Sequence, residues 1–125
     1  MTEAEREKTF TPTEIAERLR SDLPKWVHEN GYLRRTYRTH SFKGTLMVIN
    51  TIGHLAEAAW HHPDFTASYA WVEVRLMTHS ADGITEKDFA LASKIEEIVL
   101  WHPVGLGGLE GTPQDDERHA YVKRD

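Results

Sequence analysis

The feature that most constrains the fold is a strictly alternating segment that lies between two amphipathic helical patterns. Within residues 66–78, the aliphatic residues Val72, Val74 and Leu76 alternate with larger or charged side chains. Alternation at a period of two residues places one set on each face of a β-strand. We therefore predict a single long strand over residues 66–78 whose aliphatic face lies against helices.

Apolar side chains recur at helical spacing in three other segments, and local start and stop signals bound them. A cap at Thr11 opens the first segment, and a capping box from Thr85 to Asp88 opens the last. Proline cannot continue a helix, so the segments end before Pro24, Pro63 and Pro103. These signals predict helices over residues 12–22, 43–59 and 85–101.

The dipeptide Asn30-Gly31 separates two short segments rich in aromatic and β-branched residues, which is a strong hairpin signal. We predict strands over residues 25–29 and 32–41. The resulting order of elements indicates an α+β fold in which three helices pack on one face of a small antiparallel sheet. The open edges and the partly apolar far face of such a sheet predict a homodimer or a larger homo-oligomer.

Composition narrows the classes of protein further. The 125 residues are 39% hydrophobic and include no cysteine, which suits one domain that folds without disulfides. A formal charge of −5 argues against nucleic-acid binding. The charged first eight residues and the lack of a long apolar run lead us to expect a cytoplasmic protein that does not bind membranes. We divide the chain into a domain over residues 1–101 and a glycine-rich C-terminal extension over 102–125, expected to be loop or mobile.

Eight histidines are many for a chain of this length. His61 and His62 end the second predicted helix, and His79 ends the long strand. A loop after a helix and a loop after a strand can meet at one end of a layer, where Asp88 would add a fourth polar group. Imidazole titrates near neutral pH, so this group of side chains predicts acid–base catalysis.

Each of these residues also has a structural interpretation. A histidine at a helix C-terminus interacts favourably with the helix dipole, and the capping box alone explains Asp88. Three histidines can also bind zinc, as in a metal-dependent hydrolase. The chain has no His-Glu-x-x-His or Cys-x-x-Cys motif, and adjacent histidines rarely bind the same ion, so we expect no metal site.

Three motifs taken together resemble the pterin-4a-carbinolamine dehydratases. They are His-His-Pro at residues 61–63, Thr-His at 78–79 and Gly-x-Thr-Glu-x-Asp at 83–88, and the similarity extends over about residues 12–100. The resemblance implies a four-stranded antiparallel sheet with three helices, assembled as dimers or tetramers. A fourth strand is then expected, either from a different division of residues 26–29 or between residues 66 and 71.

The same resemblance implies a lyase, specifically a hydro-lyase, that converts 4a-hydroxytetrahydropterin to quinonoid dihydropterin and water. This step recycles the tetrahydropterin (tetrahydrobiopterin) used by aromatic amino acid hydroxylases, so such a hydroxylase is a possible partner in the pathway. The reaction requires one proton to be given to the departing hydroxyl and one to be removed from the ring nitrogen system. Imidazoles can do both without a metal or organic cofactor.

By this resemblance, His61 and His79 form the acid–base pair, and His62 mainly binds and orients the pterin. The division of roles among the three histidines stays open. The implied substrate-binding residues are His61, His62, Pro63, Thr78, His79, Ser80, Ala81, Asp88 and Trp26.

The chain departs from the family at two positions near these motifs. Trp60 stands where relatives usually carry a small polar or acidic residue, and Asp82 occupies a turn position that is often small. The alternative function is non-catalytic, because relatives on this fold serve as dimerisation or assembly cofactors, and a fold does not determine a function. A purely structural relative would not need the histidine trio.

Overall fold

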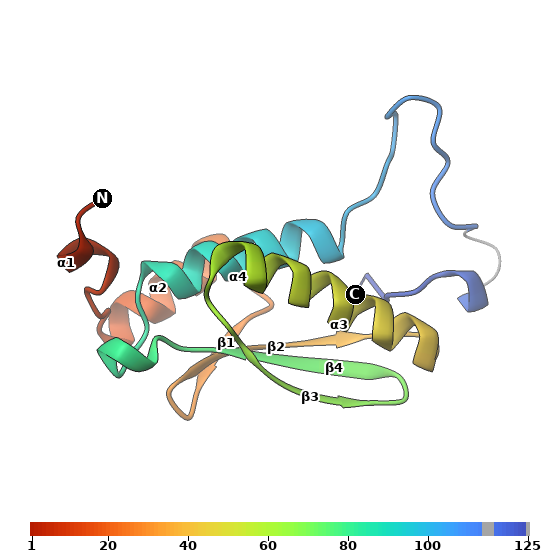
Figure 1. Ribbon diagram of the computed structural model, residues 1–125. Helices are drawn as coiled ribbons and strands as arrows, with labels where there is room; N and C mark the ends of the chain where they lie inside the picture. The colour runs from red at the N-terminus through yellow and green to blue at the C-terminus, as the bar shows by residue number, and fades with distance from the viewer. Residues whose placement is uncertain (114–116, 125) are drawn as a thin grey trace.

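A computed structural model describes residues 1–113 and 117–124 of the chain. It contains one antiparallel sheet of four strands, in the order β1-β2-β4-β3, and the long helices pack on one face of it (Figure 1). The α+β class is confirmed. The elements are α1 (Glu3–Arg6), α2 (Pro12–Asp22), β1 (Val27–Glu29), β2 (Tyr32–Arg38), α3 (Phe42–Ala59), β3 (Asp64–Ser68), β4 (Trp71–Leu76), the 3₁₀ turn η1 (His79–Ala81), α4 (Glu86–Val99) and the 3₁₀ turn η2 (Glu117–His119).

The three predicted helices are confirmed as α2, α3 and α4, with bounds shifted by at most two residues. Reciprocal capping boxes begin α2, between Thr11 and Glu14, and α4, between Thr85 and Asp88. Each satisfies backbone amides that the first helical turn leaves without partners. None of the helices in the described residues is long and apolar enough to cross a bilayer.

The predicted hairpin is also confirmed. Asn30 and Gly31 both have positive φ angles, 53° and 81°, as a two-residue hairpin turn requires. They join β1 to β2, with Glu29 paired to Tyr32 across the turn.

The prediction of one long strand over residues 66–78 is wrong, because this region forms a second hairpin. Strand β3 turns at Tyr69 and Ala70 into β4, with Ser68 paired to Trp71. Neither turn residue has a positive φ, so the turn needs no glycine or asparagine and leaves no mark in the sequence. Strand β3 is the fourth strand that the family resemblance implied in this part of the chain.

The aliphatic face of β4 lies against the helices, as predicted. Val72, Val74 and Leu76 are completely buried. They pair across the sheet with residues of β2 and share one buried core with the apolar sides of α3 and α4, which pack on each other. Burial of this surface is the main contribution to the stability of the domain.

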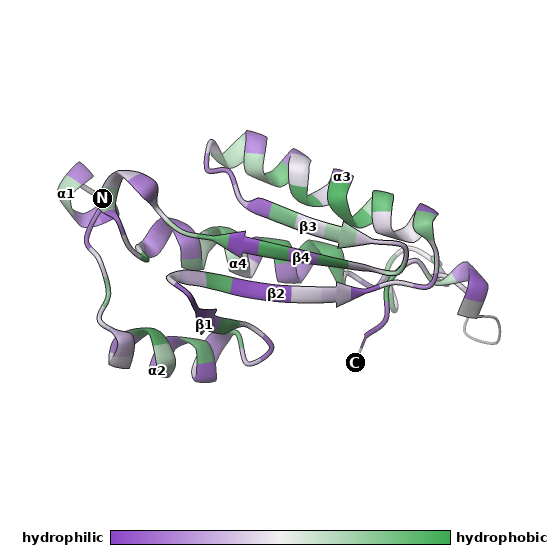
Figure 2. Ribbon diagram, turned by 90° about the horizontal axis from the view of Figure 1, so that it is seen from below, coloured by the Kyte–Doolittle hydropathy of each residue, from purple (hydrophilic) through white to green (hydrophobic). Residues whose placement is uncertain are grey.

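No helix in the described part of the chain covers the opposite face of the sheet, and Figure 2 views the molecule from that side. Charged residues form a row across it, in which Glu73 accepts hydrogen bonds from Arg34 and Arg75, each at 2.6 Å. Trp71 is 38% exposed beside them. This face of the sheet thus carries large and charged side chains, as the alternating pattern of residues 71–76 predicted.

A hydrogen-bonded polar cluster lies between α4 and the sheet, centred on the carboxylate of Glu96 in α4. Trp26 Nε1 donates to it at 3.0 Å, Arg35 Nε at 3.0 Å and the Tyr37 hydroxyl at 2.6 Å. Burial raises the pKa of Glu96, but the hydrogen bonds from Arg35 and Tyr37 outweigh burial and hold this pKa below its ordinary value. The cluster therefore contains an ion pair at neutral pH.

Part of the C-terminal extension returns to the domain. The side chain of Val122 is buried in the core, and the amide of Lys123 donates to the Arg38 carbonyl at 2.8 Å. The Tyr121 hydroxyl donates to the Val99 carbonyl at the end of α4. Close approach of the Tyr121 backbone to Gly44 leaves no room there for a side chain. Residues 121–123 thus join the ends of β2 and α4 to the start of α3.

Candidate active site

His61 is placed by the way in which α3 ends. The amide of Trp60 donates to the Glu57 carbonyl at 3.2 Å, and the amide of His61 donates to the Ala56 carbonyl at 3.1 Å. This pair of bonds is a Schellman motif, in which the residue after the helix is left-handed and usually glycine. Here that residue is Trp60, with φ 55° and ψ 46°. The chain therefore turns sharply at Trp60, and His61 follows directly.

The His61 side chain meets a buried carboxylate from α4. Asp88 is completely buried, and its Oδ1 lies 2.6 Å from His61 Nε2. Its Oδ2 accepts the Thr85 amide at 2.9 Å and the Thr78 hydroxyl at 2.8 Å. One carboxylate thus joins the end of α3, the end of β4 and the start of α4. Asp88 caps its helix and holds a histidine at the same time, so these two interpretations do not compete.

This contact determines how the imidazole of His61 can act. An ionised Asp88 accepts a proton-bearing Nε2, which leaves Nδ1 as the nitrogen that can accept a proton. A carboxylate in this position orients the ring and stabilises the imidazolium that forms when Nδ1 takes up a proton. The imidazole side chain is 14% exposed, so it retains access to a ligand. The pair is chemically suited to proton transfer.

His62 has a different environment. Its Nε2 lies 2.8 Å from a carboxylate oxygen of Glu57, and both side chains are exposed. The indole of Trp60 meets the His62 ring edge-on at a centroid distance of 5.0 Å. His62 is therefore held at the surface by α3, while His61 is held inside by α4. Their side chains diverge, as expected for adjacent histidines after a helix.

His79 begins η1, after Met77 and Thr78, which follow the end of β4. The loop is closed by Thr78, whose backbone bonds with Gly83 in both directions, and by a left-handed Asp82 with φ 51°. His79 is exposed, as is Ser80, while Ala81 is half-buried. Because the Thr78 hydroxyl is bonded to Asp88, the base of this loop is tied to the carboxylate that holds His61.

A cavity of about 570 Å³ opens beside His61 between α3 and α4. Its apolar wall includes Leu55 and Leu91, and Arg6, Lys87 and Lys94 bring positive charge to it. Pockets of this size and mixed lining are typical of small-molecule sites. Neither His62 nor His79 is among its lining residues, so of the three histidines only His61 faces this space.

Two of the remaining predicted site residues have clear positions. Pro63, half-buried, leads from His62 into β3. Trp26 is 2% exposed and its indole is bonded to Glu96, eight residues and about 12 Å along α4 from Asp88. The structure therefore brings together His61, Thr78 and Asp88, and places Trp26 in the core away from them.

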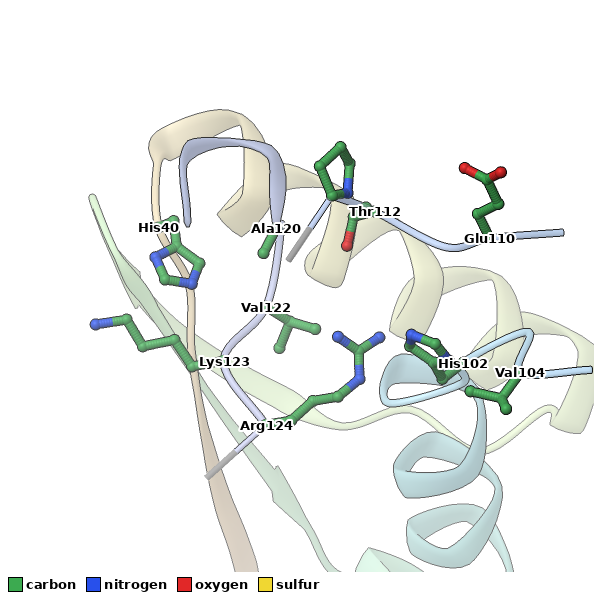
Figure 3. A pocket seen from close by; sticks show the side chains of 10 residues that line it. His40, His102, Val104, Glu110, Thr112, Ala120, Val122, Lys123 and Arg124 are labelled. Carbon is green, nitrogen blue, oxygen red and sulfur yellow. The ribbon is translucent and has the colours of Figure 1, made fainter. Parts of the chain in front are cut away.

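A larger cavity of about 720 Å³ lies elsewhere, lined by residues of the C-terminal extension and by His40, which follows β2. Figure 3 shows His102, Val122 and Arg124 around it. The guanidinium of Arg124 donates hydrogen bonds to the carbonyls of Leu100 and Trp101, just after α4, at 3.4 and 3.0 Å. Arg124, one of the cations that line this cavity, thus satisfies a helix end, whereas the smaller cavity lies beside the histidine that Asp88 holds. We therefore take the smaller cavity as the candidate site.

No group of three or more His, Cys, Asp or Glu side chains in the described residues is arranged to hold a metal ion. The carboxylate of Asp88, which contacts His61, already accepts hydrogen bonds from the Thr78 hydroxyl and the Thr85 amide.

The structure is that of an α+β protein in which a buried carboxylate holds a histidine between helix and strand ends, as a candidate acid–base site. A family model described as "Pterin 4 alpha carbinolamine dehydratase" matches residues 8–98. The chain belongs to this family, as the three motifs indicated.

Individual relatives agree with this assignment. Proteins provisionally named pterin-4-alpha-carbinolamine dehydratases are 46% identical over 90 residues in Chloroflexus aurantiacus (72% of this chain, 96% of that one) and 45% identical over 78 residues in Aquifex aeolicus (62% and 79%). A solved transcriptional coactivator/pterin dehydratase from Brucella melitensis has a TM-score of 0.68 at 30% identity, covering 74% of this chain and 99% of its own. A pterin dehydratase-like RuBisCO assembly factor of the α-carboxysome has a TM-score of 0.50 at 16% identity, over 60% and 87%, and shares the fold.

Two carboxylates near the histidines were not predicted from the sequence. Glu57, which contacts His62, lies five residues before it in the last turn of α3, so a search for acidic residues shortly before the pair could have found it. Glu7, which contacts Ser80, lies in a polar segment without any periodic pattern. No sequence signal connects residues so far apart.

Proposed function

We propose that this protein is a 4a-hydroxytetrahydropterin dehydratase, a lyase that forms quinonoid dihydropterin and water in tetrahydropterin recycling. The observation that carries the proposal is the 2.6 Å contact between His61 Nε2 and the buried carboxylate of Asp88. Membership in the family supports the choice of substrate. In this proposal the source of the substrate is an aromatic amino acid hydroxylase, and tetrahydrobiopterin is the recycled cofactor.

The chemistry divides between the two proton-transfer roles. As the C4a–O bond breaks, the hydroxyl takes up a proton and leaves as water, while the ring nitrogen system loses a proton. We assign the second role to His61, because Asp88 stabilises the imidazolium that results. His79, exposed on η1, is assigned the role of acid toward the hydroxyl, and His62 the role of orienting the pterin. The step involves no oxidation or reduction.

The substrate-binding residues of this proposal are those around the histidines. The loop of Thr78, Ser80 and Ala81 would border the pterin on one side and Pro63 on the other. Asp88 acts through His61 and so is a positioning residue. The buried indole of Trp26 has no part in this assignment.

The test is the rate of quinonoid dihydropterin formation from 4a-hydroxytetrahydropterin generated in situ, without added metal. We expect the wild-type protein to exceed the uncatalysed rate, and His61→Ala and His79→Ala each to lose on the order of 10²-fold of the acceleration. His28→Ala, an exposed histidine on β1, is the matched control and should keep the wild-type rate. A folded wild-type protein that does not exceed the uncatalysed rate would refute the proposal.

A second candidate function, binding to a protein partner, is favoured by an apolar patch at the start of α3. Phe42 and Leu46, one helical turn apart, are 53% and 43% exposed, and Tyr69 stacks on Phe42. Exposed apolar patches of this kind mark interaction surfaces. We propose that a second copy of the chain covers this patch, to give the homodimer or homotetramer expected from the sheet.

Light scattering after gel filtration tests this assembly. The wild-type protein should elute as a dimer or tetramer and Leu46→Glu as a smaller species, whereas Lys43→Glu on the same helix should not change the mass. A monomeric wild-type protein would contradict the proposed assembly and would leave the patch for a different partner.

A further inference from the structure

The N-terminal segment packs against the loop and helix that carry two of the site residues. The Phe10 amide donates to the Ile84 carbonyl at 2.9 Å, and the Phe10 ring meets Phe89 edge-on at 5.2 Å. Thr9 lies over Gly83, so closely that a side chain there would collide with it. Figure 1 shows α1 at the end of the molecule where α4 begins. The segment is thus anchored beside η1.

Glu7 extends this packing into a hydrogen-bonded bridge. The Ser80 hydroxyl lies 3.2 and 3.0 Å from its two carboxylate oxygens, and Lys87 Nζ donates to one of them at 2.5 Å. The Glu7 and Lys87 side chains are 28% and 35% exposed, so the ion pair is partly shielded from water. The hydrogen bond from Lys87, then that from Ser80, lowers the pKa of Glu7, which is ionised at neutral pH.

The two residues that Glu7 joins are sequence neighbours of the site. Ser80 follows His79, and Lys87 precedes Asp88, the partner of His61. The base of the η1 loop is held by the bond from Thr78 to Asp88. Glu7 holds the middle of the same loop, at Ser80, against the first turn of α4. With the loop held at Thr78 and at Ser80, His79 between them has little freedom to move relative to His61.

We propose that Glu7 is a positioning residue, which fixes η1 and thereby the imidazole of His79 relative to His61. This inference rests on the proposed dehydration. Glu7 precedes residues 8–98, the part of the chain that the family model matches. The role is therefore supplied by a residue just outside the part that the family model matches, and Arg6 beside it lines the cavity next to His61.

The kinetic test compares Glu7→Ala and Glu7→Asp with Glu3→Ala, which removes an exposed carboxylate from α1, the short helix that ends just before Glu7. A misplaced acid slows the chemical step more than binding. We expect Glu7→Ala to lower kcat about 10-fold with KM within about 2-fold of wild type, Glu7→Asp to recover part of the loss, and Glu3→Ala to match wild type. Equal kcat values for Glu7→Ala and wild type would overturn the proposal.

A second measurement does not depend on activity. The amides of Ala81, Asp82 and Gly83 are hydrogen-bonded within the loop, so their hydrogen exchange reports its order. We expect exchange of these amides to become about 3- to 10-fold faster in Glu7→Ala and in Ser80→Ala, which breaks the bridge from the other side, but not in Glu3→Ala.

The two measurements separate the possible failures. A wild-type protein without dehydratase activity contradicts the proposed function, and faster exchange in Glu7→Ala would then still show that Glu7 holds the loop. Unchanged exchange in both Glu7→Ala and Ser80→Ala overturns the inference, whatever the activity.

Discussion

Two carboxylates on α4 invite comparison, because both are withdrawn from water and both accept several hydrogen bonds. Asp88 accepts from Thr78 and Thr85 and contacts His61, while Glu96 accepts from Trp26, Arg35 and Tyr37. They lie about two helical turns apart on the side of the helix that faces the sheet. Burial and hydrogen bonding alone therefore do not distinguish a site residue from a structural one.

The difference lies in the partners. Arg35 remains protonated at all relevant pH values. Burial, and then the hydrogen bond to Glu96, raises the pKa of Tyr37 far above its ordinary value. The donors around Glu96 thus keep their protons, so this cluster can only stabilise the fold. The partner of Asp88 is instead an imidazole, a side chain that can both donate and accept a proton, so the same kind of carboxylate becomes part of a candidate active site.

The largest expected effect separates the two carboxylates by activity. Asp88→Asn removes the negative charge that holds His61, and an amide can present a donor where an acceptor is needed. We expect kcat for dehydration to fall on the order of 10²-fold. Glu96→Gln, the matched change two turns away, should leave kcat within about 2-fold of wild type. Similar losses in both variants would show that α4 as a whole, rather than Asp88, supports the activity.

The next effect separates them by stability. In Glu96→Gln the amide oxygen still accepts one hydrogen bond, but Arg35, which is 6% exposed, loses its counter-ion. We expect the free energy of unfolding to fall by about 2 kcal/mol, less than when a buried pair is broken completely. Urea denaturation near pH 7 measures this, with Glu97→Gln on the exposed side of α4 as control. An unchanged midpoint would contradict a stabilising role for the Glu96 cluster.

The pH dependence sharpens the same point. The pKa of Glu96 is lower in the folded protein than its ordinary value of 4.5. Its contribution is therefore complete above about pH 4.5 and is lost as the pH falls through the folded-state pKa. Between about pH 5 and 3, the free energy of unfolding should decrease more steeply for wild type than for Glu96→Gln. Parallel curves from denaturant titrations across this range would contradict the assigned pKa direction.

The smallest expected effect concerns the turn that places His61. Trp60 has a left-handed backbone, which is unfavourable for any residue with a Cβ atom, and its side chain is 76% exposed. Trp60→Gly should therefore stabilise the protein by about 1 kcal/mol. Trp60→Ala keeps the strained Cβ and should not. The midpoints of thermal unfolding of Trp60→Gly and Trp60→Ala, each compared with wild type, test this prediction. A midpoint below that of wild type for Trp60→Gly would mean that the Trp60–His62 ring contact outweighs the backbone strain.

The sequence predicted what local signals determine. Capping residues and prolines bounded α2, α3 and α4, and Asn30-Gly31 located the first hairpin. The turn at Tyr69 and Ala70 was missed, because its backbone conformation requires no special residue.

The site divides in the same way. His61 and Asp88 were both identified from motifs, but the contact between them arises from the packing of α3 on α4. Glu7 was missed because its role depends on where a segment without periodicity comes to lie.

The most direct test of the account is the protonation of the His61 ring, measured by ¹⁵N NMR at a pH where this imidazole is neutral. The contact with Asp88 predicts that Nε2 carries the proton and that Nδ1 is bare, and that this preference weakens in Asp88→Asn. A His61 ring protonated on Nδ1 in the wild-type protein would contradict the claim that Asp88 prepares this histidine for proton transfer.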